Sequence, residues 1–175
     1  MEKSIGDKVS ARIQNFNLPS YEQIPDVGLY LEQTVRFIED RLAPLSNVSI
    51  TSSMVSNYVK KDLIKNPVKK LYDREQIAYL IFIALAKSVL SLEDIRLLIE
   101  LQGKSYPPRQ AYEYFVAEFM NVLHYVYGLK EKLEDVGVEN TEEKTLLRNT
   151  IISVALKAYL DTCFAVIHEE KQTQE

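Results

Sequence analysis

The chain is poor in cysteine, glycine and histidine, and each shortage argues against a class of site. Its single cysteine, Cys163, cannot form an internal disulfide or a zinc site of several thiolates, and it fits a reducing compartment. Five glycines leave little room for a phosphate-binding loop, and the two histidines stand in no metal-ligand spacing. We therefore expect no enzyme activity, no cofactor and no metal.

Long apolar runs are also missing. The first residues, MEKSIGDKVSARIQNFNLPS, have no apolar core of the kind that a signal peptide needs. The longest apolar run, IAYLIFIALA from Ile77 to Ala86, is much shorter than the roughly 20 residues that cross a bilayer. We expect a cytoplasmic protein that does not enter a membrane.

Apolar residues at helical spacing dominate what is present, and 46% of the 175 residues are hydrophobic. One such stripe predicts a helix from Leu29 to Leu42, which Pro44 ends. A hydroxyl cap among residues 51–53 begins a short helix that closes near Lys61 and Asp62, where Asp can adopt the left-handed conformation. A turn at Asn66 and Pro67 then predicts a small hairpin.

Two further helices begin at recognisable caps. Asp73 and Gln76 form a capping box before the apolar helix from Ile77 to Leu90, and Ser91 with Asp94 repeats the device. Gly103 and the following YPP mark a domain boundary. We divide the chain into an N-terminal arm (1–17), a helix-turn-helix domain (18–103) and a helical domain (104–175).

Beyond this boundary, apolar residues recur in alternating steps of three and four from Arg109 to Val136. The pattern predicts a long helix whose face packs either in a bundle or against a second chain. A second helical stretch, Thr141 to Ile167, can fold back on the first. The spacing alone leaves open which of the two partners covers the heptad face.

Charge is distributed unevenly along the chain. The net charge is −4, but the segment from Ser56 to Arg74 contains six lysine or arginine residues and only two aspartates. This segment therefore carries +4 and the remainder −8. A basic island in an acidic chain indicates a local surface for a negatively charged partner.

The segments MVSNYVKKDLI and KKLYDREQIAYL, followed by SLEDIRLLI, resemble the winged helix-turn-helix of MerR-type bacterial transcription regulators. The chain as a whole resembles a bacterial family of unknown function that is thought to be distantly related to that group. The resemblance implies a mainly all-α fold with a short β-hairpin wing and a C-terminal helical bundle. Tyr58 matches the recognition-helix tyrosine, and Lys70 and Tyr72 stand where the arginine and tyrosine of the wing stand.

The resemblance also implies a DNA interface. Short polar side chains at the front of a recognition helix reach base edges, and lysines at its end and in the wing contact phosphates. The candidate residues are Ser53, Ser56, Asn57, Tyr58, Lys60, Lys61, Lys69, Lys70, Tyr72 and Arg74. Three departures from the family pattern are a shorter wing without a glycine tip, Ser56 at a common arginine position, and Asp62 in place of glycine.

These features predict a homodimeric, sequence-specific regulator that binds double-stranded DNA and dimerises through its C-terminal helices. Six C-terminal tyrosines either pack a core or interface, or line a pocket for an aromatic or cationic effector; they are Tyr106, Tyr112, Tyr114, Tyr125, Tyr127 and Tyr159. The alternative function is a helical adaptor protein with a degenerate helix-turn-helix that no longer binds DNA.

Overall fold

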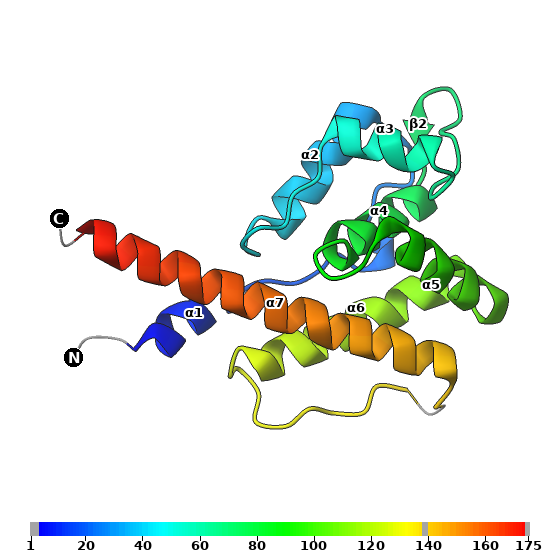
Figure 1. Ribbon diagram of the computed structural model, residues 1–175. Coiled ribbons are helices and arrows are strands. Elements are labelled where there is room, and N and C mark those ends of the chain that lie inside the picture. Colours follow the sequence, from blue (N-terminus) through cyan, green and yellow to red (C-terminus); the bar gives the residue numbers. More distant parts are fainter. Residues whose placement is uncertain (1–3, 138–139, 174–175) are drawn as a thin grey trace.

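The computed structural model describes residues 4–137 and 140–173 (Figure 1). Within these residues the chain forms seven α-helices, one 3-10 helix and a two-stranded sheet. The mainly all-α fold is therefore confirmed. The elements are α1 (Ile5–Ile13), η1 (Tyr21–Gln23), β1 (Leu29–Tyr30), α2 (Leu31–Leu42), α3 (Ser52–Lys60), β2 (Leu71–Tyr72), α4 (Arg74–Ala86), α5 (Leu92–Ser105), α6 (Pro108–Val126) and α7 (Glu142–Thr173).

The helix starts follow the capping signals in the sequence. The Thr51 hydroxyl accepts a hydrogen bond from the amide of Met54 at 3.2 Å, and the Ser91 hydroxyl accepts one from the amide of Asp94. Asp73 and Gln76 exchange bonds of 2.8 and 2.9 Å between side chain and backbone. Each cap satisfies amide groups that a helix start leaves without partners. The predicted caps are confirmed, although α4 begins three residues earlier than Ile77.

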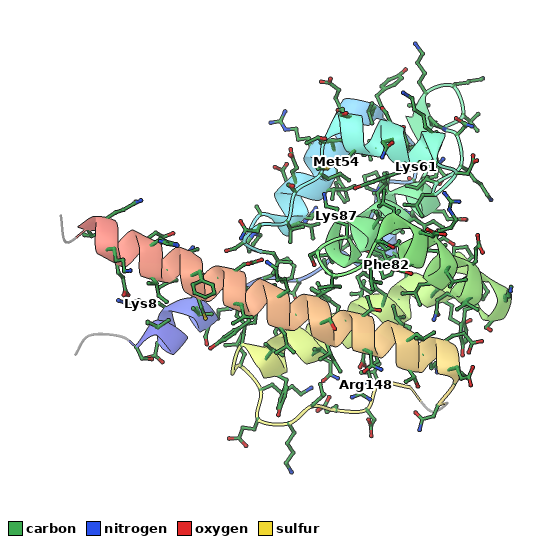
Figure 2. The ribbon with its side chains drawn as sticks, in the orientation of Figure 1. Lys8, Met54, Lys61, Phe82, Lys87 and Arg148 are labelled. Carbon is green, nitrogen blue, oxygen red and sulfur yellow. The ribbon has the colours of Figure 1, made fainter. Side chains whose placement is uncertain are left out.

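The apolar helix α4 forms the centre of the core. Ten of its residues are buried, and it contacts α2, α6 and α7. Phe82 packs edge-to-face on Phe115 of α6, with ring centroids 5.2 Å apart. Phe82 is labelled in the interior of the molecule in Figure 2. Because helices pack on several faces of α4, its apolar residues extend beyond one amphipathic stripe.

The first residues differ from the expected arm, because they form the helix α1. Ser4 and Asp7 cap it reciprocally, and Val9 and Ile13 are fully buried. The helix packs on the C-terminal part of α7 (Figure 1), where Lys8 lies 2.6 Å from Glu170. Arg12 forms a second ion pair with Glu169.

The predicted long helix from Arg109 to Val136 is wrong beyond Val126. Gly128 has φ of 72°, and the amide of Leu129 bonds to the carbonyl of His124 at 2.9 Å, which closes the helix. The chain then runs without helix to residue 137 before α7 turns back along α6. The buried heptad residues of α6 pack within the chain, against α7 and against Phe82 of α4, so the packing of this face is intramolecular.

Gly103, where we placed the domain boundary, lies inside α5. Residues on both sides of it belong to one hydrophobic core; examples are Val55, Ile81, Phe119 and Ile151. The division at residue 103 therefore follows a turn signal in the sequence and does not separate two cores.

The helix α7 has two apolar faces. One contains Leu147, Ile151, Val154 and Ala158, which are buried as predicted. On the opposite face, Leu156, Leu160 and Phe164 are about half exposed. By length and composition alone α7 is apolar enough to cross a membrane, a property that core helices share.

Candidate nucleic-acid interface

The helices α2 and α3 and the small sheet lie together at one end of the molecule (Figure 1). The strands pair antiparallel, with Leu29 opposite Tyr72 and Tyr30 opposite Leu71. This pairing connects the start of α2 to the segment that follows α3. The buried residues Val55 and Tyr58 fix α3 on the core and leave its opposite face exposed.

The exposed face of α3 is polar and ends in lysine. Ser53, Asn57, Lys60 and Lys61 are exposed, whereas Ser56 is half-buried. Residues 53, 57 and 60 follow the spacing of one helical face, so these side chains share a single surface. The structure thus brings two of the predicted short polar residues, Ser53 and Asn57, onto one face with Lys60.

A left-handed residue ends α3. Asp62 has φ of 54°, as the sequence predicted. The amide of Leu63 bonds to the carbonyl of Tyr58 at 2.9 Å, and that of Asp62 bonds to Val59, a pairing that defines a Schellman motif. Sequence reasoning missed Arg96 of α5, whose guanidinium donates to the Lys61 carbonyl, because nothing local links residues 61 and 96.

The hairpin turn lies at Lys69 and Lys70 and not at Asn66 and Pro67, so the predicted position was wrong. Among the described residues, only an isolated bridge between Val68 and Leu71 closes the hairpin, because β2 pairs with β1 and not with a strand directly before the turn. Both lysines have positive φ, 53° and 66°, and the amide of Leu71 bonds to the carbonyl of Val68 at 2.9 Å. This is the geometry of a two-residue type I′ turn, which normally contains Asn and Gly. The turn sequence gave no such signal.

The segment between α3 and β2 is also anchored to α4 by a hydrogen bond. Gln76 is buried, and its side-chain amide donates to the Lys65 carbonyl at 2.9 Å. The side chain therefore connects the N-terminal turn of α4 to the lysine-bearing loop. A fixed loop can present its charges in a defined position.

Five exposed lysines form what we call the basic surface; they are Lys60, Lys61, Lys65, Lys69 and Lys70. Within residues 4–137 and 140–173, none of them has a carboxylate at ion-pair distance. Lys8, Lys130 and Lys157 are paired. Lys104, Lys132 and Lys171 are exposed without an ion-pair partner among the described residues, so the basic surface differs from them by having five such lysines between residues 60 and 70. The cations of the basic surface are therefore available to an external anion.

Three predicted site residues lie outside this surface. Tyr58 and Tyr72 are buried, and burial raises the pKa of both phenols. The Arg74 side chain donates to the Ile24 carbonyl at 2.8 Å and pairs with Glu22 at 3.1 Å. It also lies over the ring of Tyr21. Arg74 therefore fastens the segment before α2 to α4 and does not project with the lysines.

Taken together, the fold and the basic surface define a small helical protein with exposed lysines at the end of α3 and in the segment that follows it. The chain belongs to the family described as domain of unknown function DUF1836, whose model matches residues 19–115. The matched range contains α2 to α5, the sheet and the whole basic surface. No curated protein and no solved structure matches the chain. The expected membership of a family of unknown function is confirmed, and the relationship to MerR-type regulators stays a prediction.

Proposed function

We propose that the protein is a cytoplasmic, sequence-specific DNA-binding transcription regulator with a MerR-like winged helix-turn-helix. The observation that carries the proposal is the basic surface beside the polar face of α3. Five lysines there have no ion-pair partner within the described residues, although the chain outside residues 56–74 carries −8. Lysines without partners attract phosphates by releasing counterions.

In this proposal α3 enters the major groove of DNA. Ser53, Ser56 and Asn57 contact base edges, since Asn pairs with adenine and Ser bonds to several bases. Lys60 and Lys61, at the C-terminal end of α3, contact phosphates and fix the register of the helix. Lys69 and Lys70 contact the flanking backbone from the tip of the hairpin.

Backbone strain supports a role for this hairpin. A left-handed conformation costs roughly 1–2 kcal/mol for a residue with a side chain. Lys69 and Lys70 both adopt it, although Asn and Gly would fit the turn without this strain. Strain that persists beside exposed charges is typical of functional segments.

Dimerisation through the C-terminal helices is part of the proposal. The heptad face of α6 is already covered, so we assign the contact to the outer face of α7. Leu156 and Phe164 stand four residues before and after Leu160, and all three are about half exposed. A second copy crossing at Leu160 would cover this ridge with an identical one, which is the arrangement of a two-fold dimer.

The decisive experiment selects genomic DNA fragments on the purified protein at moderate salt and sequences the retained fragments. We expect a shared palindrome that a Lys60→Ala, Lys61→Ala variant no longer retains. As a control, a Lys132→Ala, Lys171→Ala variant removes two exposed lysines outside the basic surface. This variant should still retain fragments that contain the palindrome. Random fragments that are lost equally from all three proteins as salt rises would contradict the proposal.

A second candidate function is a helical adaptor protein that no longer binds DNA. Two observations favour it: Arg74 is held internally, and Val68 beside the hairpin turn is 74% exposed. An apolar side chain at that position suits a protein partner better than a phosphate backbone. Failure to retain any DNA in the selection would favour this function.

A further inference from the structure

A cleft lies between α4, α5 and α6. Its empty space is about 530 Å³, including the part that is open to solvent. Each helix contributes residues spaced three or four apart, so one face of each forms a wall. The residues that matter below are Glu75, Tyr79, Gln102, Gly103, Tyr106 and Tyr112.

Aromatic rings form much of the lining. Of the six C-terminal tyrosines considered for an effector pocket, Tyr106 and Tyr112 line this cleft, and Tyr79 joins them from α4. The Tyr112 hydroxyl donates to the Pro19 carbonyl at 2.9 Å, and its buried ring packs on Tyr21 and Phe115, so Tyr112 adds a fixed apolar part of the wall. Tyr127 and Tyr159 instead pack on each other elsewhere. The cleft is therefore suited to a flat, apolar body.

The polar groups of the cleft are acceptors. Glu75 is the one charged side chain among the described residues that line it, and its half-buried carboxylate has no ion-pair partner there. Gln102 is 8% exposed, and its amide nitrogen donates to the Glu143 carbonyl at 2.8 Å. Its amide oxygen has no partner in the described residues. The Glu75 carboxylate and the Gln102 amide oxygen can therefore each bind a hydrogen-bond donor or a cationic group of a ligand.

A neighbouring hollow shows how these rings accommodate a positive charge. Lys144 of α7 lies with its ammonium 5.7 Å from the ring centre of Tyr106 and 5.2 Å from that of Tyr114. This hollow shares Tyr106, Gln102 and Ala111 with the larger cleft. Lys144 makes the hollow positive, so a cation in the cleft will lie at the Glu75 end.

We propose that the cleft binds a small, largely apolar molecule that carries one positive charge. The apolar body lies between the rings of Tyr79, Tyr106 and Tyr112, and the cationic group contacts the Glu75 carboxylate. Cations are attracted both to carboxylates and to the faces of aromatic rings. This inference is independent of DNA binding, because it rests on a different set of residues.

Three probes that share a naphthalene ring and carry a cationic, a neutral or an anionic group test the proposal: 1-naphthylmethylamine, 1-naphthylmethanol and 1-naphthoate, titrated by fluorescence into the full chain. We expect the amine to bind about tenfold more tightly than the alcohol, because it forms a charge-assisted bond. Glu75→Gln should reduce amine binding to the level of the alcohol and leave alcohol binding unchanged. Equal binding of all three probes, tighter binding of the naphthoate, or no binding would overturn the proposal.

Filling the cleft gives a second test that does not depend on charge. Gly103 lines the cleft, and a Cβ atom added there would meet no heavy atom within 4 Å, so we expect the side chain of Gly103→Leu to extend into the cleft. The substitution also replaces a glycine inside a helix, which favours folding. We expect this variant to lose the amine and the alcohol without a fall in Tm. Glu100→Leu, on the exposed side of α5, is the matched control and should bind normally. Normal binding by Gly103→Leu would place the ligand elsewhere and overturn the assignment.

Discussion

Arg148 of α7 and Glu118 of α6 form an ion pair in which the guanidinium Nε lies 2.9 Å from a carboxylate oxygen. The Glu118 side chain is completely buried. Burial raises its pKa, and the nearby Arg148 opposes that shift with the smaller effect. Arg148, labelled in Figure 2, also contacts Asp135 in the segment between the two helices. One arginine thus connects both helices and the chain that joins them.

Replacing Arg148 with methionine will leave the Glu118 carboxylate buried without its partner. We expect the free energy of unfolding at neutral pH to fall by about 3–5 kcal/mol, which is the usual effect of breaking a buried pair. Urea titration measures this. Lys157→Met breaks an exposed pair with Asp161 and should cost less than about 1 kcal/mol. Similar losses of unfolding free energy in the two variants would show that the Glu118 carboxyl group is not ionised in the folded protein.

The effect of Arg148→Met will depend on pH. Burial raises the folded-state pKa of Glu118 above its unfolded value, so the folded state favours the protonated acid. The corresponding stability is fully present below the unfolded pKa and is lost as pH rises through the folded one. We expect a smaller loss at about pH 5 than at about pH 7.5, measured by urea titration at both. Adding Glu118→Gln should remove this difference.

Changing Lys69 to asparagine together with Lys70 to glycine will separate stability from DNA binding. Asn and Gly accept the left-handed turn conformation that both lysines now adopt, so the free energy of unfolding should rise by about 1–2 kcal/mol. The loss of two cations should weaken DNA binding and lower its salt dependence by about two phosphate contacts. Urea titration and fluorescence anisotropy measure the two effects. Unchanged DNA binding would exclude the hairpin from the interface.

The substitution Asp62→Asn will strengthen DNA binding. Asn tolerates the left-handed conformation that ends α3, so the fold should be unaffected. Removing an anion beside the basic surface should raise affinity several-fold at low salt, and the gain should shrink as salt increases. Glu131→Gln makes the same charge change at an exposed position outside the interface and is the control. Equal gains in affinity for both variants would show that the effect comes from the net charge of the protein and not from the position of residue 62.

The substitution Leu160→Glu will separate the proposed dimer into single chains. Leu160 lies at the centre of the exposed ridge on α7, and a charge there would be buried against its own copy. Static light scattering should give the mass of two chains for the natural protein and of one chain for Leu160→Glu. Leu97→Glu alters a similarly exposed leucine on α5 and should remain dimeric. A single-chain mass for the natural protein would refute the dimer.

Local signals in the sequence were sufficient for much of the fold. The caps at Thr51, Asp73 and Ser91 act within three residues, so the sequence around each one specifies it. The left-handed Asp62 follows from the end of an apolar stripe in the same way. Ser4 and Asp7 carry the same kind of signal, and their spacing before Val9 and Ile13 would have revealed α1.

Long-range contacts decided the rest. The sequence near Arg74 gives no indication that its partners are Glu22 and Ile24, some fifty positions away, so its removal from the basic surface was not predictable. The turn at Lys69 is set by the pairing of β2 with β1, which overrides the preference of the turn residues. The end of α6 at Val126 follows from Gly128, a signal that the continuing heptad pattern obscured.

The contact between α1 and the far end of α7 also sets an order of events during synthesis. Lys8 and its partner Glu170 are 162 positions apart. At about 5–20 residues per second, the ribosome needs on the order of ten seconds or more to reach the partner after α1 has been made. During that interval the buried side chains of α1 have no helix α7 to cover them. The helix α1 is therefore among the last of the described elements to reach its final position.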